Sequence, residues 1–393
     1  RLLWYYKGKQ SAGLLAAQPQ RRGPQKRCEG VTILAKTTIA VLFGGVSSEH
    51  EVSRMSATSV LNNLDKEKFN VLAVGIKKDG SWHLYPGPTE GLCTGEWEAC
   101  KENIPVAFCP GSGMKGLVAF ENGRVRELPV DVVFPVLHGK NGEDGTVQGL
   151  LEMAGLPYTG SGVLGSALCM DKVCANLVMD AAGIARCEWD YMEAWQLADF
   201  DAIERRVAEK LHYPIFVKPA NAGASVGISK AADKAALRAA VELALRHDSR
   251  VVFERFVDGH EIECAVSGNE EVRATLPGEI LASAEFYTYD DKYVSGTSRV
   301  VIPAQLPEET LNAVRATAEK AYRALCCRGL SRVDFFVERG TGRVLLNEVN
   351  TMPGFTDISM YPKLKIAAGQ SYGQLLEELV GLALQRAGRP AHV

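Results

Sequence analysis

Two apolar runs in the first part of the chain each end in a glycine-rich loop that leads into a helical stretch. The first run, 39–43, is continuous, as in the buried strands of parallel sheets, and Gly44 and Gly45 follow it. The second run, 130–137, leads into the loop 138–145. Strands that alternate with helices predict an open parallel α/β sheet, which binds ligands at the carboxyl ends of its strands. We therefore expect these two loops to border a ligand site.

The pattern changes after residue 162, where short strands and antiparallel signals follow. The clearest is a hairpin in the last third of the chain, with strands at 332–338 and 344–350 and a turn at 339–342. The two patterns together predict a mixed fold, α/β in the first part and α+β in the rest. The other expected elements are helices at 53–64, up to 153, after 170–172 and at 372–387, and strands at 71–76, 215–218 and 251–256.

The composition is that of a globular protein. The 393 residues allow roughly two to four domains. With 46% hydrophobic residues and a net charge of −3, the chain is neither a disordered acidic protein nor a basic nucleic-acid coat. It holds no run of about 18 apolar residues that could span a bilayer. The ten cysteines show no zinc-ligand spacing and indicate thiols in a reducing compartment. We expect a soluble, cytoplasmic protein that binds neither nucleic acid nor membranes.

The first 36 residues differ in charge from the rest of the chain. They carry eight basic side chains and one acidic one, whereas the other 357 carry 36 basic and 46 acidic, a net charge of −10. Their apolar residues do not recur at the helical spacing that a targeting presequence would need. The first methionine, Met55, lies too far along to be the start, and Leu34 could be read from an alternative start codon. We expect 1–33 to be translated upstream sequence, and treat 1–36 as a leader that is non-native or disordered. A genuine flexible extension is the alternative.

The expected hairpin carries the strongest chemical signal. Side chains alternate between the two faces of a strand, so one face collects Arg332, Asp334 and Phe336 from the first strand and Leu346, Glu348 and Asn350 from the second. Two carboxylates and an amide oxygen suit Mg²⁺. The opposite face is apolar and can anchor the hairpin in a core through Val333, Phe335, Val337, Leu345 and Val349. The alternative is a solvated polar face on a two-stranded ribbon.

Three further segments carry residues that are candidates for ligand binding. Lys218 ends a strand and precedes a glycine-rich loop whose amides could approach phosphates, although the loop is not a Walker A motif and could be a plain turn. Glu254 could accept a hydrogen bond from an exocyclic amine and Glu261 from ribose hydroxyls, or both could be ordinary charges at strand ends. Glu49 lies near a helix start, where an acid also serves as a cap.

Taken together and in this order, eight segments resemble the D-alanine–D-alanine ligases of the ATP-grasp superfamily. The resemblance runs from about Thr38 to about Val380 and rests on GGVSSEHEVS, HGKNGEDGTVQG, MDK, KPANAGASVG, ERFVDGHEIE, EFYTYDDKY, SRVDFF and NEVNTMPGFTDIS. It implies a three-domain ATP-grasp architecture: an N-terminal substrate-binding α/β domain (37–168), a central ATP-grasp subdomain (169–257) and a C-terminal catalytic and metal-binding domain (258–393). An unrelated nucleotide-binding module without catalysis is the alternative, and it leaves the set around Asp334 unexplained.

The resemblance also implies the reaction. The carboxylate of a first D-alanine attacks the γ-phosphate of ATP to give an acyl phosphate. The amine of a second D-alanine attacks that carbonyl, and the tetrahedral oxyanion collapses to D-alanyl-D-alanine, a precursor of peptidoglycan, with ADP and phosphate. The implied cofactors are ATP and two Mg²⁺ or Mn²⁺ ions, because phosphoryl transfer between anions needs charge neutralisation and alignment. The family implies a homodimer.

The resemblance assigns roles to individual residues of this chain. Those expected to bind ATP are Lys172, Lys218, Glu254, Val257, Glu261, Phe286 and Lys292, the last reaching the γ-phosphate from a closing loop. The expected metal ligands are Asp334, Glu348 and Asn350. Glu49 and His138 would contact the first D-alanine, and Ser359 would receive the carboxylate of the second. Arg332 and the Gly354 amide would stabilise the oxyanion and the acyl phosphate.

Two positions bear on the subclass and on the closing loop. Tyr293 is absent from relatives that make D-alanyl-D-lactate, so it favours D-alanine as second substrate and excludes D-serine less firmly. The family usually carries Gly-Ser-Ser in its phosphate loop, and the first serine bonds to the counterparts of Glu49 and Tyr293. Here that position is Ala224, followed by Ser225, which we retain as a catalytic candidate. We expect an active enzyme whose loop closes less firmly.

Overall fold

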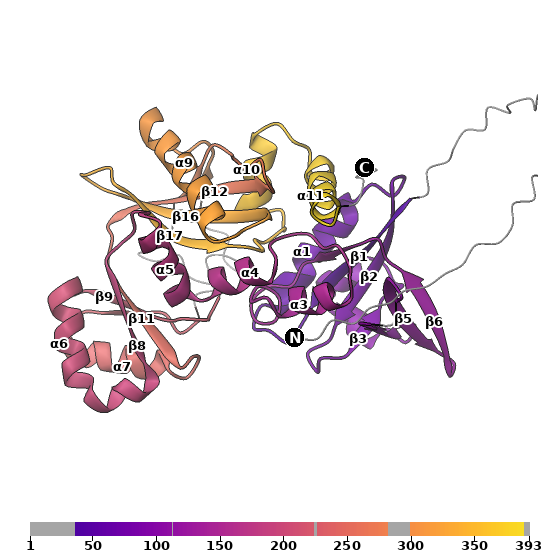
Figure 1. Cartoon of the computed structure of the whole chain (residues 1–393), viewed down its shortest axis with the longest axis horizontal. Coiled ribbons are helices and arrows are strands. Elements are labelled where there is room, and N and C mark those ends of the chain that lie inside the picture. Colours follow the sequence, from indigo (N-terminus) through magenta and orange to yellow (C-terminus); the bar gives the residue numbers. More distant parts are fainter. Residues whose placement is uncertain (1–35, 112, 224–225, 282–298, 389–393) are drawn as a thin grey trace, which may run out of the picture. The chain divides into compact units, whose positions relative to one another are not determined.

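A computed structural model describes residues 36–111, 113–223, 226–281 and 299–388 of the chain (Figure 1). The leader up to residue 35 lies outside these ranges. Four of the expected site residues also lie outside them: Ser225, Phe286, Lys292 and Tyr293. Ala224 does too.

The first sheet has seven strands in the order β6-β5-β4-β3-β2-β1-β7. They are β1 (Thr37–Gly44), β2 (Phe69–Ile76), β3 (Trp82–Leu84), β4 (Ile104–Phe108), β5 (Gly116–Glu121), β6 (Arg124–Pro129) and β7 (Val132–Pro135). Strand β1 runs parallel to β2 and β7, but every other pair is antiparallel. The expected parallel sheet is thus confined to three strands. Short connections account for three of the four antiparallel pairs, since parallel pairing needs a long crossover, and β5 meets β6 through Asn122-Gly123, both at positive φ; the exception is β3 and β4, which are joined through α2 (Glu90–Thr94) and η1 (Glu96–Ala99).

Helices cover both faces of the parallel strands. Those around the first sheet are α1 (His50–Asn63), α2 (Glu90–Thr94), the 3₁₀ helix η1 (Glu96–Ala99) and α3 (Thr146–Met153). Ile39, Val41 and Phe43 of β1 pack in one core with apolar residues of α1, whereas Ala40 and Leu42 pack in another with residues of α3. This two-sided burial accounts for the continuous apolar run in the sequence.

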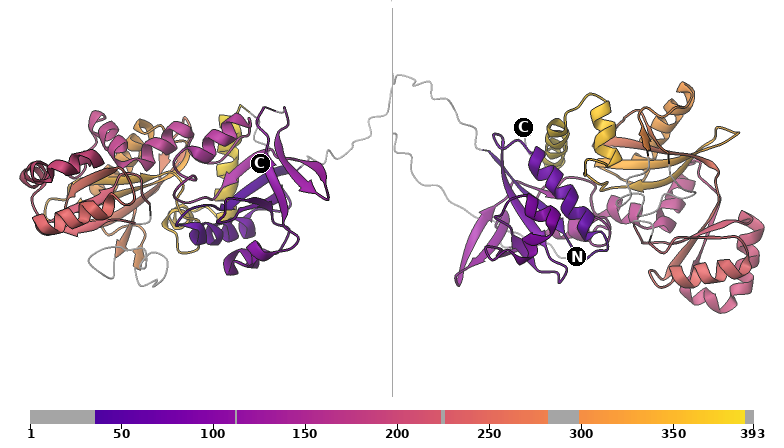
Figure 2. Two further views of the ribbon diagram at one scale, coloured as in Figure 1. Left: turned by 90° about the horizontal axis from the view of Figure 1, so that it is seen from below. Right: turned by 180° about the vertical axis from the view of Figure 1, so that it is seen from behind.

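The second sheet has four antiparallel strands in the order β10-β9-β11-β8. Its strands are β8 (Trp189–Glu193), β9 (Ile215–Pro219), β10 (Ser229–Ala231) and β11 (Arg250–Arg255), and the helices nearby in sequence are α4 (Val163–Met170), α5 (Lys172–Ala181), η2 (Ala194–Asp199), α6 (Phe200–Leu211) and α7 (Lys234–Ala244). Helices α6 and α7 lie on one face of the sheet (Figure 2), where their apolar residues pack in one core with Val217, Val251 and Phe253. Because side chains alternate, Lys218 and Glu254 lie on the opposite face.

The third sheet holds the predicted hairpin. Its strands are β12 (Gly259–Gly268), β13 (Arg273–Ala274), β14 (Gly278–Leu281), β15 (Arg299–Val301), β16 (Gly329–Glu338) and β17 (Val344–Asn350), in the order β15-β14-β12-β16-β17 with β13 beside β12. Helix α9 (Glu308–Ala324) and part of α5 pack on one face, and α10 (Met360–Ala367) packs against β12 and β14 in another core. The last helix, α11 (Tyr372–Arg386), shares that core with β1 and β7 (Figure 1). The end of the chain is therefore tied to the first sheet.

The hairpin departs from the predicted alternation at one residue. Asp334 pairs with Glu348, but the next pair joins Phe335 to Leu346, so Asn347 is an extra residue in β17. An extra residue turns every side chain beyond it to the other face. Leu346 therefore lies in the apolar core beside Phe335, and Leu345 lies with Val257 and Cys187. The expectations for Leu345 and Leu346 were wrong, whereas those for Arg332, Asp334, Glu348 and Asn350 hold.

The helix after the first loop begins three residues earlier than predicted, at His50. The helix expected after 170–172 is α5, and the last helix ends one residue before its predicted end. Among the described residues, no helix is both long enough and apolar enough to cross a membrane.

Candidate active site

A cleft is lined by residues of the loops that follow β1, β7 and β9, of the third sheet, of the junction between α4 and α5, and of the loop after β17. It brings together eight of the residues expected from the sequence: Glu49, His138, Lys172, Arg332, Glu348, Asn350, Gly354 and Ser359. Five others that the structure describes do not line it: Lys218, Glu254, Val257, Glu261 and Asp334. Asp334 is nevertheless hydrogen-bonded to Arg332, and Arg332 lines the cleft.

Three neighbouring strands build an arginine cluster, which we define as Arg332, Asp334, Glu263, Glu348 and Asn350. Strand pairing places Glu263 of β12 opposite Asp334 of β16, Asp334 opposite Glu348 of β17, and Arg332 opposite Asn350. Arg332 donates from Nε to Asp334 Oδ1 (2.8 Å) and from Nη2 to Oδ2 (2.7 Å), and its Nε lies 3.0 Å from Glu263 Oε2. Burial alone would lower the pKa of Arg332, but Asp334 and Glu263 raise it well above its usual range. The guanidinium stays charged.

The arginine cluster has more acids than cations, which suits a bound metal ion. Three carboxylates surround one guanidinium, and the Asn350 amide oxygen, which accepts from the Met352 N–H at 3.1 Å, completes a set of hard oxygen donors. In the described part of the chain, no three His, Cys, Asp or Glu side chains are arranged to hold a metal among themselves. The predicted set has two carboxylates and an amide, and such a set fits Mg²⁺, which commonly takes one or two protein carboxylates and completes its shell with water and phosphate.

Glu263 is the functional candidate that the sequence prediction missed. It is buried, lines the cleft and contacts Arg332. The signal was present, because Glu263 ends the segment ERFVDGHEIE and shares a strand face with Glu261 two residues earlier. Glu143, in the loop after His138, also lines the cleft and was given no role.

A second group, the lysine cluster, consists of Lys172, Lys218 and Glu254. Lys218 Nζ lies 2.5 Å from Glu254 Oε2, and Lys172 donates to the Ala222 carbonyl at 2.7 Å. Burial lowers the pKa of Lys172. Burial acts in the same direction on Lys218, but Glu254 more than offsets it and raises the pKa of Lys218. Two cations with one acid leave an excess of positive charge, which suits phosphate groups.

The start of α5 and the glycine-rich loop hold the lysine cluster in place. The Asp171 carboxylate caps α5 by accepting from the Cys174 amide, and it also pairs with Arg250 and accepts from the Asn221 side chain. At the edge of the described part of this loop, a Cβ on Gly223 would come 2.8 Å from Glu49 Oε2. The loop backbone thus reaches Glu49, as the expected latch requires, although Ala224 and Ser225 lie outside the described residues.

Glu49 does not cap helix α1 with its side chain, which was the alternative that the sequence left open. It occupies the N-cap position of α1, but its side chain makes no capping hydrogen bond, and it is buried at the cleft. Its amide donates to Ser47 Oγ (3.1 Å), and Ser47 Oγ donates to the His138 carbonyl (2.9 Å). These bonds hold Glu49 and His138 at one wall of the cleft.

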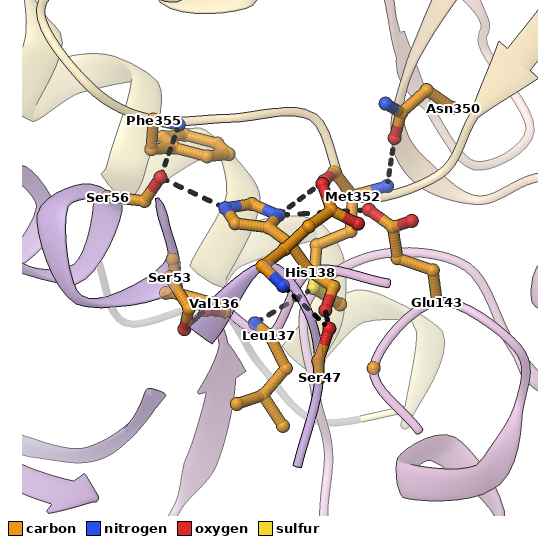
Figure 3. A network of polar contacts seen from close by, with 12 residues as sticks. Ser47, Ser53, Ser56, Val136, Leu137, His138, Glu143, Asn350, Met352 and Phe355 are labelled. Atoms are coloured by element: carbon orange, nitrogen blue, oxygen red, sulfur yellow. Dashed lines mark hydrogen bonds and ion pairs between the residues drawn. The ribbon is translucent and has the colours of Figure 1, made fainter. Parts of the chain in front are cut away.

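His138 joins two distant parts of the chain (Figure 3). Its Nδ1 lies 3.1 Å from the Met352 carbonyl and 3.7 Å from Glu143 Oε1, and its Nε2 lies 3.0 Å from Ser56 Oγ. Burial opposes a charge on this imidazole, but Glu143 and Glu49 together hold its pKa above the usual value. His138 is thus fixed in orientation beside two acids.

The segment 351–359, which we name the oxyanion loop, carries Gly354 and Ser359. A Cβ on Gly354 would come 2.7 Å from Ser359 Oγ, so glycine leaves this hydroxyl its place beside the backbone. Ser359 occupies the N-cap position of α10, and its Oγ accepts from the Thr356 amide at 3.1 Å. A helix N-terminus with a hydroxyl suits a carboxylate ligand.

The described residues expected to contact adenine and ribose do not line the cleft, and one of them, Glu254, belongs to the lysine cluster. Val257 is buried with Leu345 and Cys187, and Glu261 of β12 pairs with Phe336 and Ile280. The bulge at Asn347 accounts for the position of Leu345 against Val257. Phe286, which the sequence expects against the adenine, lies outside the described residues.

Comparisons with known proteins show the family of the chain. Two family models match, "D-ala D-ala ligase N-terminus" over residues 38–161 and "D-ala D-ala ligase C-terminus" over 178–381. A D-alanine–D-alanine ligase of Thermoanaerobacter sp. (strain X514) is 51% identical over 353 residues, which are 90% of this chain and 98% of that relative.

Two solved structures are similar along nearly the whole chain. The VanG D-Ala:D-Ser ligase from Enterococcus faecalis matches with a TM-score of 0.81 and 40% identity, covering 89% of this chain and all of that one. The D-alanine–D-alanine ligase from Coxiella burnetii matches with a TM-score of 0.80 and 34% identity, covering 90% and 95%. These matches confirm the expected ATP-grasp fold class. Family models match both parts of the chain, and about half of the aligned residues are identical to those of a relative covered over 98% of its length, so the chain belongs to the D-alanine–D-alanine ligase family.

Proposed function

We propose that this enzyme joins two D-alanines into D-alanyl-D-alanine and converts ATP to ADP and phosphate. Its relatives are named for the ligation of D-alanine to D-alanine. One observation carries the proposal: a single cleft is lined by Glu49 for an ammonium group, by Arg332 and the Gly354 amide for an oxyanion, and by Ser359 for a carboxylate. A dipeptide ligase needs these three kinds of group together. A nucleotide-binding module without catalysis would need none of them.

In the first step the chain prepares one D-alanine and ATP for phosphoryl transfer. Glu49 accepts the ammonium group of the amino acid, and the nearby His138 and Ser47 hold Glu49 in place. Lys172 and Lys218 neutralise the phosphates. The carboxylate oxygen forms a bond to the γ-phosphorus while the bond from that phosphorus to the β,γ-bridging oxygen breaks, which releases ADP. Alignment and charge neutralisation supply most of the rate in such transfers.

In the second step the amine of another D-alanine attacks the acyl carbon. Ser359 and the N-terminus of α10 receive its carboxylate, which sets the direction of attack. Negative charge develops on the carbonyl oxygen, where Arg332 and the Gly354 N–H stabilise it. The tetrahedral species collapses with loss of phosphate, and the C–N bond of the dipeptide remains.

The metal ions belong to this proposal. Asp334, Glu348 and Asn350 would hold Mg²⁺ or Mn²⁺, and the ion supplies charge neutralisation for the phosphates when it is bound. The roles of Glu254, Val257, Glu261, Phe286, Lys292, Tyr293 and Ser225 remain proposals that rest on the resemblance.

The domain division, the homodimer and the cytoplasmic location are also proposals. The three sheets use strands within 37–135, 189–255 and 259–350, which supports the division at 168 and 257. The family supports the dimer, and a demand for ATP supports the cytoplasm. Light scattering on the purified protein tests the oligomeric state.

The experiment is phosphate release from ATP with D-alanine as the only amino acid, in the presence of Mg²⁺, followed by mass analysis of the products. We expect phosphate and dipeptide in equal amounts. Parallel reactions with D-serine or D-lactate added test the second substrate, since one structural relative is a D-Ala:D-Ser ligase. ATP binding without phosphate release would overturn the proposal and favour a non-catalytic module.

A further inference from the structure

Ser56 is a fully buried serine on α1 to which the chemistry above gives no role. Its hydroxyl has two partners from other parts of the chain (Figure 3). It lies 3.0 Å from Nε2 of His138, and it accepts a hydrogen bond from the Phe355 N–H at 3.1 Å. Phe355 belongs to the oxyanion loop and lies 299 residues further along the chain. One buried hydroxyl thus joins the oxyanion loop to the wall of the cleft formed by Glu49 and His138, which we name the first-substrate wall.

The hydrogen positions in this network follow from the partners. A carbonyl only accepts, so His138 Nδ1 must carry the hydrogen that it gives to the Met352 carbonyl. In the neutral imidazole, Nε2 then accepts, and Ser56 donates to it. In the imidazolium, Nε2 donates and Ser56 accepts. A hydroxyl serves both states, because it can act as donor or acceptor.

These bonds bracket Gly354. His138 holds the carbonyl of Met352, two residues before it, and Ser56 holds the amide of Phe355, one residue after it. Glycine has no side chain to restrict its backbone, so the direction of its N–H depends on such external bonds. The Phe355 carbonyl is also fixed, by the Tyr372 hydroxyl. The loop is therefore positioned from both sides.

The network also reaches the residues that bind the substrate and the metal. Ser47 links the Glu49 amide to the His138 carbonyl, and the Met352 amide donates to Asn350. Ser56 is the link whose removal separates the His138 ring from the Phe355 amide without altering any group that would touch a substrate.

We propose that Ser56 is a positioning residue for ligation: its hydroxyl couples His138 to the Phe355 amide and so sets the Gly354 N–H against the first-substrate wall. The inference deepens the proposed function, since it rests on the assignment of the Gly354 N–H to the oxyanion. It predicts that loss of the hydroxyl slows catalysis more than it weakens ATP binding, because the oxyanion exists only during the reaction.

Ser53 is a matched control one turn earlier on the same helix. It is also fully buried, and its hydroxyl also makes two hydrogen bonds, but both are to Gly44 and Val136 beside the first sheet. We compare Ser56→Ala with Ser53→Ala. Both variants should melt at lower temperature by similar amounts. Ser56→Ala should lose about tenfold or more in kcat, with the KM for ATP within about twofold, while Ser53→Ala should keep kcat within about threefold.

A binding measurement separates positioning from a general loss of structure. A phosphinate dipeptide analogue of the tetrahedral species should bind Ser56→Ala more weakly, by about the same factor as the loss in kcat, and bind Ser53→Ala normally. Equal losses in the two variants, or an unchanged kcat in Ser56→Ala, would overturn the proposal.

Hydrogen exchange covers the case in which Ser56→Ala does not fold. In the wild-type protein the Phe355 amide should exchange slowly, and fast exchange there would contradict the bond to Ser56. Should the wild-type enzyme release no phosphate with D-alanine, the proposed function fails. The coupling is still decided by whether exchange of the oxyanion loop rises in Ser56→Ala and not in Ser53→Ala.

Discussion

The lysine cluster and the arginine cluster both place cations in or beside one cleft, but they balance charge in opposite ways. In the lysine cluster two cations share one acid, Glu254, whereas in the arginine cluster three acids and an amide surround one guanidinium. The first arrangement attracts phosphate and the second attracts a metal cation. Protonation differs even within the lysine cluster: burial lowers the pKa of Lys172, whereas Glu254 raises that of Lys218, as Asp334 and Glu263 raise that of Arg332, against the effect of burial. The carboxylates around Arg332 thus outweigh the effect of burial, whereas those near Lys172 do not.

Replacement of Arg332 by lysine should have the largest effect. Lysine keeps the charge but is a single point donor, so it cannot pair with both oxygens of Asp334 and also face the oxyanion. We expect kcat for phosphate release to fall by about 10²- to 10³-fold. Arg126→Lys is the matched control, because Arg126 makes a similar two-bond pair with Glu121 on the surface. If kcat of Arg332→Lys falls by less than tenfold, Arg332 does not stabilise the reacting groups.

Replacement of Glu263 by glutamine tests whether the extra acid frees Asp334 for the metal. Without that charge Arg332 relies more on Asp334, which it holds with two hydrogen bonds, and this makes Asp334 a weaker ligand. We expect Mn²⁺ to bind about tenfold more weakly, measured from free Mn²⁺ by electron paramagnetic resonance in the absence of nucleotide.

Glu261 provides the control on the same strand. It does not line the cleft, and Glu261→Gln should raise the KM for ATP and leave Mn²⁺ binding unchanged. Equal Mn²⁺ affinity in the two variants and the wild type would show that Glu263 has no part in the metal site.

Replacement of Lys172 by arginine tests the protonation difference. The folded-state pKa of Lys172 lies below its usual value, so this lysine loses its charge early as the pH rises, and ATP binding should weaken on the alkaline side. Arginine stays charged. Lys172→Arg should lose about tenfold in kcat/KM for ATP at neutral pH, because the two side chains differ in shape, but its alkaline limb should move to higher pH.

The same shift has a consequence for stability. Between the lowered pKa of Lys172 and that of a free lysine, the unfolded chain binds more protons than the folded chain, so the free energy of unfolding should rise with pH there. Denaturant melts at several alkaline pH values measure this rise, which Lys172→Arg should abolish. If Lys172→Arg changes neither the alkaline limb of kcat/KM for ATP nor the rise of the free energy of unfolding with pH, Lys172 is not the group responsible.

Restoring serine at Ala224 should have the smallest effect. A serine there could bond to Glu49, as in the usual phosphate loop, and one neutral hydrogen bond is worth roughly 0.5–1.5 kcal/mol, or at most about tenfold in loop closure. Ala224→Ser should lower the KM for D-alanine and slow proteolysis between residues 282 and 298. If both stay as in the wild type, the idea of a weakened latch is wrong.

Strand alternation was enough to predict which polar residues of the hairpin lie together. Arg332, Asp334, Glu348 and Asn350 were placed together because they repeat with period two on two adjacent strands, and the structure pairs them. The same rule failed for Leu345 and Leu346, since the extra residue Asn347 depends on how two strands pair and leaves no mark in either strand alone.

Contacts between distant segments were beyond the sequence. Ser56 and Phe355 are ordinary residues in their own segments, and only the packing of the oxyanion loop against α1 makes their bond. Strand alternation could have placed Glu263 on the same face as Glu261. Its contact with Arg332 could not be predicted, because it depends on the pairing of β12 with β16. The antiparallel part of the first sheet was missed although Asn122-Gly123 is a hairpin signal.

The central claim, that one cleft first phosphorylates a D-alanine carboxylate and then joins it to a second amine, is tested most directly by the fate of an oxygen atom. D-Alanine labelled with ¹⁸O in its carboxylate is incubated with ATP and Mg²⁺, and the released phosphate and the dipeptide are analysed by mass spectrometry. The account predicts one ¹⁸O in each phosphate, because the attacking carboxylate oxygen leaves with the phosphorus. Dipeptide accompanied by unlabelled phosphate would contradict it.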